Sequence, residues 1–89
     1  PIDMLKIDGE FVREMLSKET DYSIVESIHR VGHTMGLKTV AECVETADIL
    51  RELKLIGVDY GQGMYLSKRR PLKDVLLVAE TRSSARAQA

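Results

Sequence analysis

The chain is poor in the features that mark disulfide-rich, thiolate-caged and membrane-anchored proteins. Cys43 is its only cysteine, which excludes an intramolecular disulfide and a metal cage made of thiolates. No apolar run is long enough to cross a bilayer. The formal net charge of −1 provides neither the basic footprint of a protein that binds a nucleic-acid polymer nor a polybasic membrane anchor. The 89 residues, 44% hydrophobic and 30% charged, indicate one small globular domain at most.

The start of the chain also lacks two features. It begins at Pro1 and not at an initiator methionine, and no leader of charged and then apolar residues follows. We therefore expect a piece of a longer protein rather than a secreted precursor.

Three short apolar runs predict β-strands that each lead into a helix. The expected strands cover residues 2–7, 37–44 and 58–66. Each run carries a charged or amide side chain toward its end, and these residues are Lys6, Glu42 and Gln62. When βα units succeed one another, the strands lie parallel and their C-terminal ends share one rim. The sequence therefore predicts that these three side chains are neighbours and face a common mouth.

Apolar residues at helical spacing predict the segments that follow the strands. The expected helices run over residues 11–16, from Thr20 or Asp21 to Gly36, from Thr46 to Gly57, and onward from Pro71. The second helix is expected to bury one stripe, formed by Ile24, Val25, Ile28, Val31 and Met35. His29 and His33 have a zinc-binding spacing on this helix, but no third ligand is evident, so we expect surface histidines.

The predicted order β-α-β-α-β-α fits two α/β architectures, a doubly wound open sheet and part of a (β/α)8 barrel. Three parallel strands with helices on one side leave two open edges and one uncovered face. A complete barrel needs about 250 residues. We therefore expect the chain to need the rest of its barrel or a second copy of itself. Its inner layer or other sheet face is expected to contain Ile7, Val40, Ala41 and Val58.

Four segments carry motifs in a characteristic order. They read KIDGEFV at residues 6–12, GLKTVAECVET at 36–46, IGVDYGQG at 56–63 and RPL at 70–72. Together they resemble the EAL domains, bacterial phosphodiesterases that hydrolyse cyclic di-GMP. The resemblance implies that residues 1–78 are the C-terminal β-α-β-α-β-α part of a TIM-type (β/α)8 barrel, and that residues 79–89 are a disordered tail or linker. The resemblance also implies that the EAL signature and the family's other metal ligands would lie upstream of this segment.

The resemblance also implies roles for five side chains. In the family, two divalent ions, Mg²⁺ or Mn²⁺, assist the hydrolysis of the phosphodiester. Glu42 matches a carboxylate that binds metal, and Lys6 matches a lysine that contacts the attacking water and the phosphate. Gln62 is expected to orient Glu42 or the waters of the site. Glu45 and Asp8 are expected to contact substrate or to support the residues that do.

The same residues, taken without the resemblance, have simpler interpretations. Glu42 and Lys6 suit ion pairs at strand ends, and Gln62 suits a turn between two glycines. Glu45 is favourable at the start of a helix, and Asp8 suits a turn. Cys43 stands where the family usually has glycine, which changes the backbone freedom beside Glu42.

The function implied by the resemblance is that of a fragment of a cytoplasmic bacterial phosphodiesterase, which converts cyclic di-GMP to a linear dinucleotide. The isolated chain is expected to be inactive, because Glu42 alone cannot hold two metal ions. An alternative is a degenerate EAL domain that binds cyclic di-GMP as a receptor without cleaving it. A third interpretation is a dimerisation element.

Overall fold

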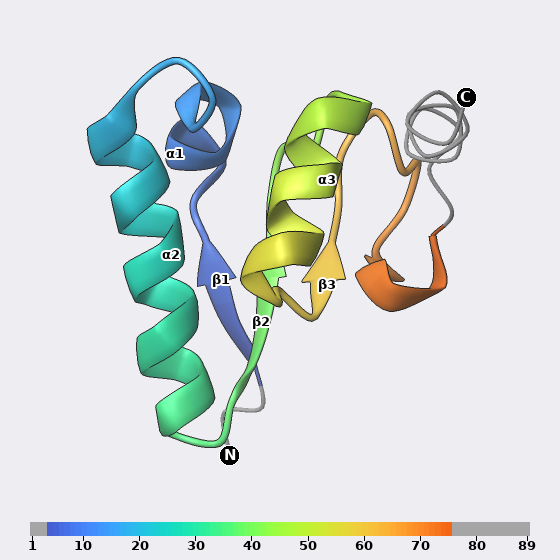
Figure 1. Cartoon of the computed structure of the whole chain (residues 1–89). Helices are drawn as coiled ribbons and strands as arrows, with labels where there is room; N and C mark the ends of the chain where they lie inside the picture. Colours follow the sequence, from blue (N-terminus) through green and yellow to red (C-terminus); the bar gives the residue numbers. More distant parts are fainter. Residues whose placement is uncertain (1–3, 76–89) are drawn as a thin grey trace, which may run out of the picture.

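The chain forms a mixed sheet with helices on one face. The computed structural model describes residues 4–75, and its sheet has the strand order β1-β2-β3-β4 (Figure 1). The strands are β1 (Met4–Ile7), β2 (Lys38–Ala41), β3 (Tyr60–Gly61) and β4 (Arg70–Pro71). β1, β2 and β3 are parallel, as the βα pattern predicts, whereas β4 pairs antiparallel with β3. The antiparallel strand was not expected from the sequence.

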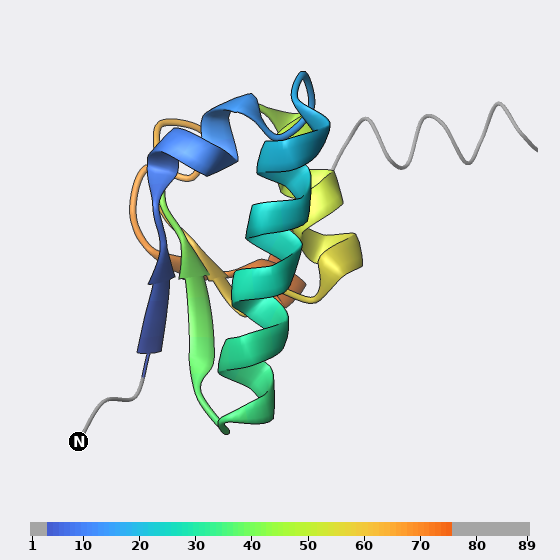
Figure 2. The same cartoon turned by 90° about the vertical axis from the view of Figure 1, so that its left-hand side faces the viewer.

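Three α-helices follow β1 and β2. They are α1 (Gly9–Glu14), α2 (Glu19–Thr34) and α3 (Ala47–Ile56), and a 3-10 turn, η1, covers Leu72–Asp74. Figure 2 shows α2 and α3 on the same side of the strands, with α1 across their upper end. The fold of the described residues is thus a sheet covered by helices on one face. Within these residues, no helix combines the length and the hydrophobicity needed to span a membrane.

Local signals explain where most helices begin and end. The Asp8 carboxylate accepts a hydrogen bond of 2.9 Å from the Glu10 N–H and caps α1. Thr46 caps α3 in the same way, and α3 ends at Gly57 with a φ of 101°. Gly36, with a φ of 78°, ends α2 as predicted. The predicted cap of α2 is wrong, because this helix begins at Glu19, after Lys18, which makes no side-chain cap bond.

The core lies between the sheet and the helices. Ile7, Ala41 and Val58 from the sheet side pack in one cluster with Leu50 and Leu53 of α3. Val40 is fully buried but lies outside this cluster, since it alternates with Thr39 and Ala41 and so points to the other face. Of the four residues expected in an inner layer, the structure therefore places Ile7, Ala41 and Val58 under the helices.

The predicted apolar stripe of α2 extends too far. Val25 is buried, whereas Val31 and Met35 are 55% and 68% exposed. The last turns of α2 approach the sheet through Gly32 instead, where a Cβ atom would lie only 2.9 Å from Thr39 Cγ2. Close packing at a residue without a side chain turns the neighbouring apolar residues outward.

Two predicted strands are shorter than expected. β2 ends at Ala41 and not at Val44, and β3 ends at Gly61 and not at Leu66. Pro71 belongs to β4 and precedes η1 rather than starting an α-helix. The rest of that predicted helix, beyond Val75, and the tail over 79–89 lie outside the described residues.

Candidate active site

The carboxyl ends of the three parallel strands meet at one end of the sheet, the upper end in Figure 1. Glu42 directly follows β2, and Gln62 directly follows β3. The backbone pairing continues past the strands, because the Glu42 N–H donates to the Ile7 carbonyl (3.1 Å) and the Gln62 N–H donates to the Ala41 carbonyl (2.9 Å). These bonds hold the first residue of each loop beside the neighbouring strand.

Lys6 and Glu42 come together at this rim. The Lys6 Nζ lies 4.0 Å from Glu42 Oε2, and the two side chains are 62% and 39% exposed. Such a distance is at the limit of an ion pair and too long for a hydrogen bond. An exposed pair of this kind contributes only about 0–1 kcal/mol to stability. The pair therefore leaves the Glu42 carboxylate free to bind another partner. Because the pair contributes so little to stability, its presence at the rim is not explained by a structural role.

A shallow hollow opens beside Glu42. It has a volume of about 400 Å³ and is lined by Glu42, Cys43, Glu45, Gln62, Gly63 and Met64. The structure thus brings together three of the predicted side chains, and Lys6 joins them through its contact with Glu42. Asp8 is not among the lining residues, and its carboxylate caps α1. Its geometry is that of the simpler interpretation, a residue that starts a helix.

Three lining residues, Cys43, Gly63 and Met64, were not among the predicted site residues. Cys43 has a φ of 59° and Gly63 a φ of 153°, so both loops bend sharply at the hollow. The Val44 N–H donates to the Gln62 carbonyl (3.0 Å), and the Tyr65 N–H donates to the Val44 carbonyl (3.1 Å). The two loops are therefore tied to each other by their backbones. The glycines on either side of Gln62 signalled the bend at Gly63 in the sequence, and the cysteine in place of the family's usual glycine marked the bend at residue 43.

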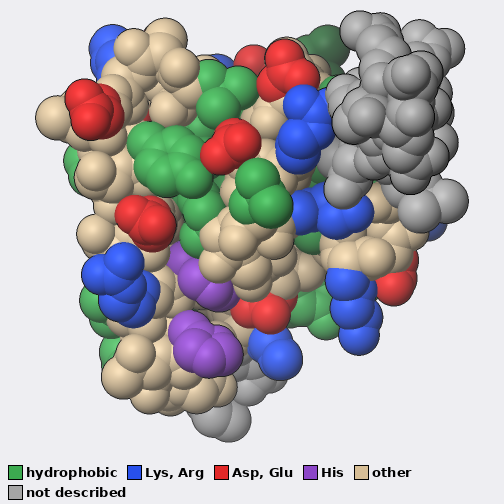
Figure 3. Space-filling model, in the orientation of Figure 1, with side chains coloured by type: hydrophobic (Ala, Val, Ile, Leu, Met, Phe, Trp, Pro, Cys, Tyr) green, Lys and Arg blue, Asp and Glu red, His purple; other side chains and the backbone are tan. Residues whose placement is uncertain are grey.

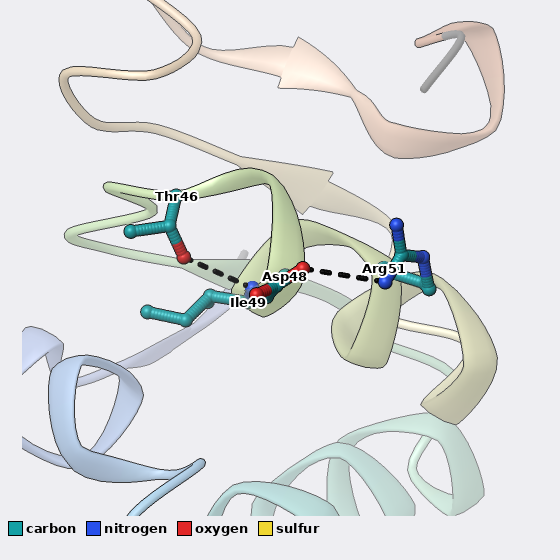
Figure 4. Close-up of polar contacts among 4 residues, drawn as sticks. All are labelled: Thr46, Asp48, Ile49 and Arg51. Atoms are coloured by element: carbon teal, nitrogen blue, oxygen red, sulfur yellow. Dashed lines mark hydrogen bonds and ion pairs between the residues drawn. The ribbon is translucent and has the colours of Figure 1, made fainter. Parts of the chain in front are cut away.

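The loop after β2 runs directly into the start of α3. The Thr46 Oγ1 accepts a hydrogen bond of 3.2 Å from the Ile49 N–H, and Asp48 pairs with Arg51 at 3.3 Å on the outer side of the helix (Figure 4). The cap fixes the chain direction immediately after Glu45. A local signal in the sequence, Thr46, thus anchors one end of the loop that carries Glu42.

The donor atoms at the rim suit a hard divalent cation only in part. Carboxylate oxygens are typical ligands of Mg²⁺ and Mn²⁺, and the Glu42 carboxylate is exposed and weakly paired. Within residues 4–75, however, no group of three or more His, Cys, Asp or Glu side chains could hold an ion. Glu42 therefore fits the role of one ligand, and the remaining ligands would come from outside this segment.

A polar network lies at the opposite end of the sheet. The Nδ1 of His29 is 2.8 Å from the Thr39 Oγ1, and the Thr39 N–H donates to the Asp59 carboxylate at 2.9 Å. Burial lowers the pKa of His29, and the nearby Asp59 carboxylate opposes this effect. The expectation of surface histidines is wrong for His29, which is half-buried between α2 and β2, while His33 is exposed. Figure 3 shows the two histidines together on the helix-covered face.

A second hollow of about 440 Å³ lies near this network. Its charged lining residues are Lys38, Lys54, Asp59 and Lys73. The Lys54 Nζ donates a hydrogen bond of 2.7 Å to the Val75 carbonyl, so this amine already has a partner in the protein. This hollow is remote from the carboxyl ends of the parallel strands, so we do not consider it the candidate active site.

The comparison with known proteins decides the family. A model of the EAL domain matches residues 1–69, about three quarters of the chain. The chain belongs to the EAL domain family. It is similar to the cyclic di-GMP phosphodiesterase PdeB of Shewanella oneidensis, with 42% identity over 87 residues, which cover 98% of this chain and 10% of the relative. This EAL segment spans about a tenth of the length of the curated relatives it matches.

Solved structures support the same fold. The phosphodiesterase MucR of Pseudomonas aeruginosa, in a complex with cyclic di-GMP, has a TM-score of 0.73 and 37% identity, covering 85% of this chain and 31% of that one. The manganese and cyclic di-GMP complex of Klebsiella pneumoniae BlrP1 has a TM-score of 0.67 and 35% identity, covering 78% and 17%. The predicted fold class, a portion of a TIM-type α/β barrel, is confirmed.

Proposed function

We propose that the complete protein containing this EAL segment hydrolyses cyclic di-GMP to the linear dinucleotide. The observation that carries the proposal is the pairing of Lys6 and Glu42 at 4.0 Å, at the carboxyl ends of parallel strands, in a chain that matches the EAL family. The carboxyl ends of barrel strands are where barrel enzymes place their reacting groups. The similarity to phosphodiesterases and to a complex with cyclic di-GMP supports the choice of substrate.

Each rim residue has a chemical role in this proposal. Bound divalent ions would activate a water molecule and neutralise charge on the phosphate. Glu42 would hold one of these ions, and Mg²⁺ or Mn²⁺ suits its carboxylate. The Lys6 ammonium would stabilise the negative charge that develops on the phosphate and orient the attacking water. Gln62 and Glu45, which line the same hollow, would position Glu42 and the substrate. Asp8 would act indirectly, through the start of α1.

The isolated 89-residue chain should be inactive in this proposal. Two ions need several ligands, and the described residues supply Glu42 without a cluster of further donors. We propose residues 1–78 as the C-terminal part of the EAL domain, with the remaining barrel or a second copy of the chain as its partner. The cytoplasm, where cyclic di-GMP would be available to such an enzyme, is the proposed compartment.

The test is an assay of the complete protein with cyclic di-GMP and Mn²⁺ or Mg²⁺, in which chromatography separates the cyclic from the linear dinucleotide. We expect hydrolysis that stops when EDTA removes the metal and resumes when metal is returned. Binding of cyclic di-GMP without hydrolysis at any metal concentration would contradict the enzymatic proposal and support the alternative, a degenerate EAL domain that acts as a receptor.

A further inference from the structure

The loop that carries Glu42 contacts the start of α1 through one side chain. Gly9, the first residue of α1, is buried, and a Cβ atom on it would lie 2.1 Å from the Cys43 Sγ and 2.8 Å from the Cys43 Cβ. Non-bonded carbon atoms prefer separations of about 3.5–4.0 Å. The Cys43 side chain therefore occupies the space that any side chain at residue 9 would need.

This space, and not the backbone conformation, explains the glycine. Among the described residues the glycines with positive φ are Gly36, Gly57 and Gly63, so Gly9 adopts a conformation open to every residue. Alanine is the better helix former at such a position. A glycine is thus unfavourable for α1 by itself, and its benefit lies in the contact with Cys43.

The contact is coupled to Glu42 through the backbone. Rotation of the Cys43 side chain would move the Sγ away from residue 9, but the Cβ, at 2.8 Å, would stay because the backbone fixes its position. Relief of the remaining overlap therefore requires the backbones of Cys43 and residue 9 to move apart. The Glu42 carbonyl carbon, 3.6 Å from the same point, is bonded to that backbone. A shift of Cys43 would therefore displace Glu42 and change its 4.0 Å contact with Lys6.

We propose that Gly9 and Cys43 are a matched pair: glycine at residue 9 leaves room for the Cys43 side chain, and so keeps the Glu42 carboxylate in its place beside Lys6. The inference rests on the proposed role of Glu42 as a metal ligand. It assigns to Gly9, a residue outside the hollow, control over the metal affinity of the site.

The test compares four forms of the complete protein: wild type, Gly9→Ala, Cys43→Gly and the double variant. Isothermal titration calorimetry measures the Mn²⁺ dissociation constant of each. Gly9→Ala should raise this constant about 10–100-fold, the range found when residues that support metal ligands are changed. Cys43→Gly removes both overlapping atoms, so the double variant should recover near wild-type affinity. Such recovery is the signature of a direct contact between the two residues.

Gly36→Ala provides the matched control. Gly36 has a φ of 78°, and a Cβ on it meets nothing within 4 Å. This change strains the backbone at the opposite end of the sheet without touching the rim. It should lower the Tm and leave the Mn²⁺ affinity unchanged. A Gly9→Ala variant that behaves like Gly36→Ala, with a lower Tm and normal affinity, would overturn the proposal, as would a double variant that stays weak.

A metal-free measurement separates this inference from the proposed function. The amide resonance of Glu42 in NMR spectra should move when Gly9→Ala is made in the wild type and stay in place when Gly9→Ala is added to Cys43→Gly, whether or not the wild type binds Mn²⁺. A wild type without Mn²⁺ binding would therefore reject the proposed function alone. If Gly9→Ala does not fold, alanine at residue 9 must still be accepted on the Cys43→Gly background, and its failure there overturns the pairing.

Discussion

Replacing Glu42 by glutamine should separate catalysis from stability. The side chain keeps its size and loses its charge, and its ion-pair contact is with Lys6 Nζ at 4.0 Å. Because both side chains are exposed at the rim, the free energy of unfolding should fall by less than about 1 kcal/mol. Turnover of cyclic di-GMP by the complete protein should fall by about 10²–10³-fold, the scale for loss of a group that stabilises charge in the transition state. At 1.36 kcal/mol for each factor of ten, this is roughly 3–4 kcal/mol.

The assay measures hydrolysis at saturating Mn²⁺ together with urea unfolding of the same preparations. Asp48→Asn is the matched control, because it removes another exposed carboxylate, paired with Arg51 at 3.3 Å on α3 and away from the hollow. The control should retain normal turnover. Turnover of Glu42→Gln within a few-fold of the wild type would refute the assignment of Glu42. A large loss of unfolding free energy would show instead that the rim pair is a structural ion pair.

Three further predictions follow from the described residues. Thr46→Ala removes the 3.2 Å cap bond to Ile49 and should cost about 1 kcal/mol in urea unfolding, whereas Thr46→Ser should not. Burial lowers the pKa of His29 in the folded state, so the contribution of His29 to the free energy of unfolding should be complete above pH 6.5 and be lost as the pH falls through the folded pKa. His29→Gln should flatten the pH dependence of the free energy of unfolding between pH 7 and 5. The isolated chain should self-associate through the open sheet edges, β1 and β4, and through exposed apolar residues such as Leu55. A stable monomer in sedimentation at micromolar concentration would contradict the partial-barrel interpretation.

The motifs in the sequence were sufficient for the family and for the order of the parallel strands. Capping signals are local, since they depend on hydrogen bonds within one turn of the chain. For this reason Thr46 and Gly57 marked the ends of α3 correctly. The expected meeting of Lys6 and Glu42 also followed from sequence, because parallel βα units bring strand ends to one rim. The functional roles of these residues stay predictions.

Contacts between distant segments decided what local signals could not. Strand ends depend on pairing partners, and β3 ends at Gly61 because the following loop bonds to the loop after β2. Neither the antiparallel β4 nor the approach of α2 to the sheet through Gly32 leaves a periodic pattern in the sequence. The position of His29 in the sequence was typical of a helix surface. In the structure its ring contacts the hydroxyl of Thr39, ten residues later, at the interface between α2 and β2. The sequence by itself thus determined the family and the rim residues. The tertiary structure determined where strands stop and which side chains are buried, because pairing and packing depend on segments that only folding brings together.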